Sequence, residues 1–167
     1  MDYSIRPYRP GEEEYVAQLH ERLYAAEYGW GREFLDYAVA IPRRFAQKEK
    51  NDREELYIAE TDGRPVGCIL LCGTEDPGVG QLRVFAVEKE RRRRGIGAAL
   101  LQTAMDKAKS AGYGKLILWT ADTAAAAVRK YEKLGFRTVE TKENHSWDPD
   151  GKAVKEMKME MRIDRER

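Results

Sequence analysis

The stretch "ERRRRGIGAAL", from Glu90 to Leu100, places four arginines directly before Gly-Ile-Gly and a run of small and apolar residues. The apolar pattern predicts a strand at 81–87 before it and a helix at 95–111 after it. A helix start beside a strand end is a typical anion site, because first-turn N–H groups lack partners and the helix dipole is positive there. Glycines also let a phosphate approach the backbone. The repulsion between the arginines is tolerable around a ligand with several phosphates, so the stretch predicts such a ligand.

Two other interpretations of the arginines stay open, a solvated loop and a contact with nucleic acid. A dinucleotide-binding loop is disfavoured because Leu100 stands where a third glycine is needed, and the Gly-Lys-Ser/Thr of a phosphate loop is absent. The whole chain has 30 Lys and Arg against 29 Asp and Glu. This balance argues against a protein built mainly to bind nucleic acid or a membrane surface.

The length of 167 residues suits one domain, which we expect to span 3–165. There is no apolar run long enough for a membrane span, and the first residues lack a signal-peptide layout, so a cytoplasmic protein is expected. Cys68 and Cys72 fall on a predicted strand, about 13 Å apart, and are expected to be buried rather than bonded. His20 and His145 are far apart in sequence, and no metal site is predicted.

The apolar periodicity predicts a mixed α/β domain in the order β-αα-βββ-α-β-α-ββ. Strands are expected at 3–8, 55–60, 64–71, 81–87, 115–120, 136–142 and 154–163. Helices are expected at 11–29, 32–48, 95–111 and 124–135. Pro42 is expected to kink or interrupt the second helix, and Asp62-Gly63 predicts a tight hairpin turn.

Two motifs resemble landmarks of the GNAT family of N-acetyltransferases. "VEKERRRRGIGAALL" resembles the family's acetyl-CoA loop, Arg/Gln-x-x-Gly-x-Gly/Ala, with Arg92, Gly95 and Gly97 at the marked positions. "RKYEKLGF", residues 129–136, resembles its second landmark, a helix with a tyrosine before Glu-Lys-x-Gly-Phe. The resemblance implies the GNAT fold, a central mixed, mostly antiparallel sheet of six to seven strands flanked by about four helices.

A closer likeness is to the acetyltransferase half of proteins that fuse a MarR-type helix-turn-helix to this domain. It lies in "ERLYAAEYGWGREF", "LILWTADTAAAAVRKYEKLGF" and "NHSW". The chain departs from the family at Ala124, where many relatives have asparagine, and at Arg93 and Arg94, where glycine and a long polar residue are common.

The resemblance implies an enzyme that transfers the acetyl group of acetyl-CoA, its cosubstrate, to an amine by direct attack. Tyr131 is the implied general acid for the departing thiolate. Backbone groups at the end of the central strand are implied to align the pantetheine arm, and the loop to hold the diphosphate. The implied cofactor residues are Phe85, Ala86, Val87, Arg92, Arg93, Arg94, Gly95, Ile96, Gly97 and Ala98.

The acceptor site is implied to lie near the first helix and the late strands. Its candidate residues are Tyr24, Glu27, Tyr28, Trp30, Trp119 and His145, with Trp147 close by. Aromatic faces and a carboxylate both attract an ammonium, so a small amine or an amino acid-like acceptor is expected. Glu27, Asp122 and His145 are alternative bases acting through water. Simple core packing of the aromatic residues is the competing interpretation.

Three other functions stay open. The domain could bind acetyl-CoA as a sensor without turnover, acetylate a protein, or bind nucleic acid through Arg91–Arg94. The last is disfavoured by the charge balance. We expect a small-molecule partner, no nucleic acid and no membrane, and the sequence leaves a homodimer open.

Overall fold

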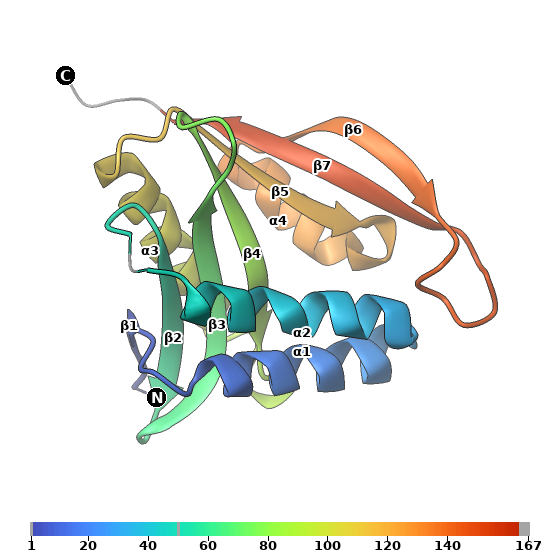
Figure 1. Cartoon of the computed structure of the whole chain (residues 1–167), viewed down its shortest axis with the longest axis horizontal. Helices are drawn as coiled ribbons and strands as arrows, with labels where there is room; N and C mark the ends of the chain where they lie inside the picture. Colours follow the sequence, from blue (N-terminus) through green and yellow to red (C-terminus); the bar gives the residue numbers. More distant parts are fainter. Residues whose placement is uncertain (1, 50, 164–167) are drawn as a thin grey trace.

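Seven strands form one mixed sheet in the order β1-β2-β3-β4-β5-β7-β6 (Figure 1). The computed structural model describes residues 2–49 and 51–163. The strands are β1 (Ser4–Pro7), β2 (Glu55–Thr61), β3 (Arg64–Gly73), β4 (Val79–Val87), β5 (Lys115–Ala121), β6 (Arg137–Asn144) and β7 (Val154–Arg162). The helices are α1 (Glu13–Tyr28), α2 (Arg32–Gln47), α3 (Ile96–Ser110) and α4 (Ala125–Leu134). The predicted order of elements and the mixed sheet are confirmed; positions 164 and 165 of the predicted domain lie outside the described residues.

Every neighbouring pair in the sheet is antiparallel except β4 and β5. This parallel pair is short, because only Val79–Gln81 is paired with Lys115–Ile117. Beyond it the two strands diverge, and Figure 1 shows β5 turning away from β4.

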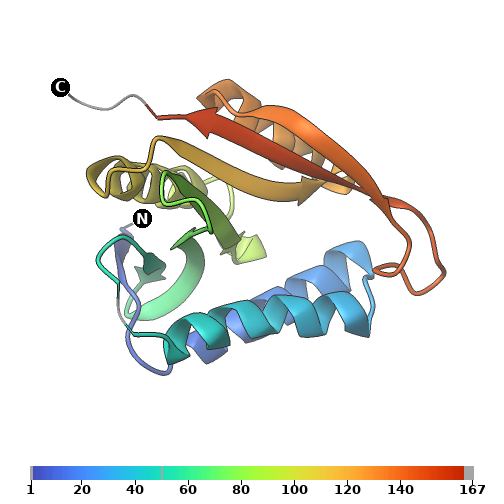
Figure 2. The same cartoon turned by 45° about the horizontal axis from the view of Figure 1, so that its top comes forward.

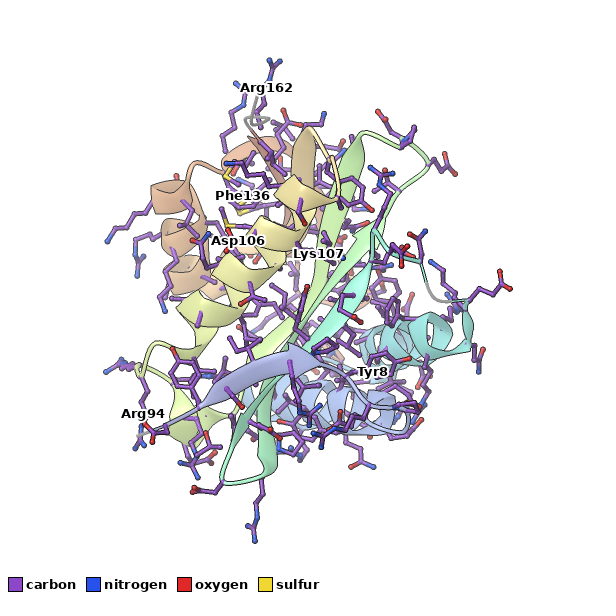
Figure 3. All side chains as sticks on the ribbon, turned by 90° about the vertical axis from the view of Figure 1, so that its left-hand side faces the viewer. Tyr8, Arg94, Asp106, Lys107, Phe136 and Arg162 are labelled. Carbon is purple, nitrogen blue, oxygen red and sulfur yellow. The ribbon has the colours of Figure 1, made fainter. Side chains whose placement is uncertain are left out.

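Helices cover both faces of the sheet, with α1 and α2 on one face and α3 and α4 on the other (Figure 2). Along β3, apolar side chains point to both faces of the sheet, so helices must bury both faces. Cys68 and Leu70 pack into the cluster that contains α1, whereas Ile69 and Leu71 pack into the cluster that contains α3. In Figure 3, α3 crosses its face of the sheet, with Asp106 and Lys107 on its outer side.

The predicted interruption at Pro42 is wrong, because α2 continues through this residue to Gln47, and the alternative of a kink stays a prediction. Pro42 is itself buried, and its neighbours Ile41 and Phe45 pack against the core beneath α1. This packing outweighs the one backbone hydrogen bond that a proline removes.

The local turn and cysteine predictions are confirmed. Asp62 and Gly63 both have positive φ, 52° and 75°, as the tight turn between β2 and β3 requires. Cys68 and Cys72 are unbonded on β3, the first buried and the second partly buried. None of the helices in the described part of the chain is long and apolar enough to cross a membrane.

Gly67 lies closer to its neighbours than Gly73, the other glycine of β3. A Cβ at Gly67 would lie 3.0 Å from the Ala86 carbonyl oxygen and 3.2 Å from Leu100 Cδ1, whereas one at Gly73 would meet nothing closer than 3.4 Å. We therefore expect Gly67→Ala to lower the free energy of unfolding by about 1–3 kcal/mol through overpacking. Gly73→Ala, on the same strand, should change it by less than about 0.5 kcal/mol. Urea denaturation of both variants checks this, and equal losses would contradict it.

Candidate active site

A bulge in β4 marks the place where the sheet opens. Cys68 pairs with Ala86 and Leu70 with Arg83, so β4 has one more residue than β3 in this interval. Within the bulge, Val84 has φ of 47°, a left-handed conformation that a β-branched residue rarely adopts. Cys68 Sγ donates a hydrogen bond to the Val84 carbonyl oxygen, at 3.1 Å. Bulges bend the strand that carries them, which accounts for the divergence of β4 from β5.

A cavity of about 500 Å³ lies where the strands diverge. Tyr24 and Phe34, from α1 and α2, line it on one face of the sheet, and Ala127 and Tyr131, from α4, line it on the other. The cavity therefore passes between β4 and β5, and it can admit one molecule from each face.

The end of β4 offers unpaired backbone groups to this opening. Glu88 N–H donates to the Val66 carbonyl on the β3 side, at 2.8 Å. Successive amides of a strand point to opposite sides, so the Val87 N–H faces the edge from which β5 has diverged. The carbonyl of Val87 accepts a hydrogen bond from Arg92 Nε, at 3.1 Å.

The loop before α3 has the backbone of an anion site. Gly95 has φ of 83° and α3 begins at Ile96, so the positive helix end faces the loop. Arg93 also has a positive φ, 66°, which explains why glycine suits that position. A Cβ at Gly97 would lie 3.6 Å from Phe85 and 3.7 Å from Val87, so the helix start adjoins the free end of β4. Figure 3 shows Arg94 at the outer edge of the loop.

Arg92 and Glu27, predicted for different parts of the site, pair with each other. Arg92 Nη2 lies 2.7 Å from Glu27 Oε1, and Arg92 Nη1 donates to Glu27 Oε2 at 3.1 Å. The pair connects the end of α1 to the end of β4. Glu27 is thus held by the loop and does not line the cavity, in contrast to its predicted place in the acceptor wall.

Tyr131 lies in the cavity wall, between Phe85 and Phe136, with ring centroids 6.5 Å and 5.8 Å away. Burial, with a smaller contribution from Tyr28, raises the pKa of its phenol. Tyr131 therefore keeps its proton at neutral pH, as a general acid must before it acts.

The predicted acceptor residues divide into two groups. Tyr24, Tyr28, Trp30 and Trp119 line the cavity. Tyr24, Tyr28 and Trp30 are also packed as core, since Trp30 is only 6% exposed and its ring lies 5.3 Å from that of Tyr24, whereas Trp119 lies outside this stack.

His145 and Asp122 lie elsewhere. His145 is exposed, with Nδ1 3.2 Å from the Gly151 carbonyl oxygen, and it does not line the cavity. Asp122 accepts a hydrogen bond from the Lys155 N–H, at 3.3 Å, and is exposed too. Neither residue is placed to act directly on a molecule in the cavity.

The loop between β6 and β7 closes one end of the cavity. Gly31 N–H donates to the Trp147 carbonyl at 2.6 Å, which fastens the loop to the α1–α2 turn, and the two lie together in Figure 2. The Trp147 ring packs 5.0 Å from Trp30 and 4.6 Å from Phe34.

Several polar residues of the cavity were missed by sequence reasoning. They include His20, Glu33, Gln81, Arg83, Lys142 and Glu156. Glu156 lies on the strand face that alternation marks as polar and solvated, yet it is buried. No local signal distinguished it from Glu160 on the same face.

His20 is a fully buried histidine with one unsatisfied nitrogen. Its Nδ1 lies 2.9 Å from the Val16 carbonyl oxygen, so Nδ1 carries the proton, and its Nε2 has no partner within the described residues. Burial lowers its pKa to about 4.

Comparison with known proteins agrees with this geometry. The sequence profile of the Acetyltransferase (GNAT) family matches residues 14–136. An uncharacterized N-acetyltransferase of Methanocaldococcus jannaschii is 31% identical over 125 residues, which cover 72% of this chain and 51% of that protein. The matched segments cover between 33% and 62% of the lengths of the similar curated proteins.

Solved structures share the whole fold at low sequence identity. The ribosomal-protein-S18-alanine N-acetyltransferase of Escherichia coli has a TM-score of 0.74 at 21% identity, covering 99% of this chain and 97% of that one. A GNAT acetyltransferase of Elizabethkingia anophelis, solved with acetyl-CoA bound, has a TM-score of 0.66 at 22% identity, covering 96% and 98%. At such identity the likeness shows the fold alone.

The buried His20 makes stability depend on pH. Its folded pKa of about 4 lies below the ordinary value of 6.5, so between these values the unfolded chain binds a proton that the folded chain does not. Stability should fall by about 3 kcal/mol through this group as pH drops from 7 to 4. His20→Phe should lose this slope, and His145→Phe, at the other histidine, should keep it. Urea denaturation across the pH range measures the slopes, and a His20→Phe slope equal to that of the parent would contradict the assignment.

Proposed function

The chain belongs to the acetyltransferase (GNAT) family, and we propose that it transfers the acetyl group of acetyl-CoA to a primary amine of a small or amino acid-like acceptor. The uncharged amine attacks the thioester carbon, the C–N bond forms, and the C–S bond breaks. Holding both reactants in one cavity supplies much of the rate by proximity. The observation that carries the proposal is the cavity that crosses the sheet beside Tyr131.

We assign acetyl-CoA to the α3 and α4 face. Backbone N–H groups at the start of α3, from Gly95 to Ala98, bind the diphosphate with help from Arg93 and Arg94. The side chain of Arg92 is held by Glu27, so this residue contributes mainly through its backbone. The pantetheine arm then pairs with the free edge at Phe85, Ala86 and Val87, as an added strand would.

Tyr131 completes the transfer by giving its phenol proton to the departing CoA thiolate. The proton that the amine loses leaves through water, and the phenolate is reprotonated from solvent. The raised pKa of Tyr131 keeps its proton available at neutral pH.

A compact acceptor suits the aromatic wall on the α1 and α2 face. Tyr24, Tyr28, Trp30 and Trp119 give it apolar faces, and Glu156, not Glu27, gives it a buried carboxylate. The Escherichia coli protein of similar fold is named as an acetyltransferase of a ribosomal protein, so acetylation of a protein amine is the alternative. The closer likeness to MarR fusions, the cytoplasmic location and a homodimer stay predictions of the sequence.

Tyr131→Phe should lower turnover about a hundredfold, because it removes the proton donor and keeps the ring. Acetyl-CoA affinity, measured by calorimetry, should barely change. Tyr113→Phe is the matched control, since Tyr113 is a buried tyrosine whose hydroxyl donates to the Arg53 carbonyl outside the cavity. The measurement is CoA thiol release over a panel of amines and amino acids, under conditions where chemistry limits the rate.

The same assay separates the alternatives. Full turnover by Tyr131→Phe would assign the proton to water or another group. Acetyl-CoA binding by the parent protein without thiol release for any amine would favour a sensor. Acetylation of a protein alone would overturn the small acceptor.

A further inference from the structure

Glu156 is a buried carboxylate in the wall of the cavity. It is 9% exposed and lies on β7, opposite Ala121 of β5. Its Oε2 accepts a hydrogen bond from Asn144 Nδ2, at 3.3 Å. Its Oε1 has no hydrogen-bond partner within the described residues, so it is available to a donor in the cavity. A buried carboxylate that lacks a close partner is costly, which makes a cation its natural complement.

Lys142 shows what kind of group fits beside this carboxylate. Its Nζ lies 3.9 Å from Glu156 Oε2 and 4.8 Å from the centroid of the Trp119 ring. The chain's own ammonium thus lies between a carboxylate and an aromatic face, two groups that attract cations. The contact is loose, because 3.9 Å is long for an ion pair and the Lys142 side chain is 56% exposed. A ligand ammonium that is better desolvated can displace it.

We propose that Trp119 and Glu156 form an ammonium subsite in the cavity, which binds a second basic group of the acceptor in competition with Lys142. The inference rests on the proposed function in one respect, because it takes the bound ammonium to belong to the acceptor of the acetyl group. The nitrogen that attacks a thioester must be uncharged, whereas a carboxylate beside an aromatic face stabilises the charged form. The group in the subsite is therefore not the reacting nitrogen. The acceptor carries two basic groups, as a diamine does.

The other charged residues in the cavity wall attract a cation less than this subsite does. Arg83 repels a cation, and its Nη2 donates to the Tyr37 hydroxyl at 2.9 Å on the α2 side. Glu33 is exposed, so its attraction is weakened by water. Among the residues that the structure describes, Glu156 alone is a buried carboxylate in the wall.

The test compares diamines with amino alcohols of the same skeleton, which replace one ammonium by a hydroxyl. We would use the diamines of butane, pentane and para-xylene, each with its matched amino alcohol. The quantity is the ratio of kcat/KM for diamine to that for amino alcohol, from thiol release. The variants are Glu156→Gln, which keeps the Asn144 hydrogen bond, Glu156→Asp, which keeps the charge, and Lys142→Met. Glu160→Gln is the control, because Glu160 lies on the same strand, pairs with Lys115 at 3.4 Å and is outside the cavity.

We expect the parent protein to favour at least one diamine about tenfold, a difference of about 1.4 kcal/mol. Glu156→Gln should bring the ratio near one, Glu156→Asp should restore part of it, and Lys142→Met should raise it. Glu160→Gln should leave it unchanged. A ratio near one in the parent, or one that survives Glu156→Gln in a protein of unchanged melting temperature, would overturn the subsite. An unchanged ratio in Lys142→Met would overturn the competition.

A direct measurement of binding tests the subsite independently of the proposed function, because it requires no acetyl transfer. If the parent protein acetylates no amine, the proposed function fails, and calorimetric titration with the same pairs still tests the subsite. Tighter binding of a diamine than of its amino alcohol, lost in Glu156→Gln, would support it. Equal binding of both would contradict it.

Discussion

The left-handed backbone at Val84 is the constraint on which the rest of the site depends. It allows β4 to carry one residue more than β3, and the strand bends away from β5 after only three residues of parallel pairing. A regular strand would close the sheet and bury the backbone of Val87 in a ladder. The strain at a β-branched residue in this region, of order 1–3 kcal/mol, is tolerated because the two helix layers fix the strand on both faces.

Because the sheet opens between β4 and β5, different residues line its two faces. The free edge of β4, the start of α3 and Tyr131 meet on one side, and the aromatic residues of α1 and α2 with Glu156 meet on the other. The Arg92–Glu27 pair connects the sides, since it joins the loop before α3 to the end of α1. The Glu27 carboxylate also offsets one of the four adjacent arginine charges, whereas the positive end of α3 does not reduce their repulsion.

Sequence reasoning predicted the parts of the molecule that local patterns determine. Short runs of consecutive residues determine the order of elements, the hairpin at Asp62-Gly63 and the helix start at Gly95. The interruption that it allowed at Pro42 does not occur, because packing on the core outweighs the local effect of the proline. The acceptor wall shows the same limit. Glu27 is predicted for the acceptor site because aromatic residues surround it in the sequence. In the structure it pairs with Arg92, which lies far along the chain.

The bulge leaves an unpaired edge on β4, and the proposed function requires acetyl-CoA to pair with this edge as an added strand would. Amide hydrogen exchange with and without acetyl-CoA tests it most directly, residue by residue. We expect the amides of Phe85 and Val87 to exchange at least tenfold more slowly in the complex, together with those from Gly95 to Ala98 at the start of α3. Saturating acetyl-CoA that protects the loop but leaves both β4 amides unchanged would contradict it.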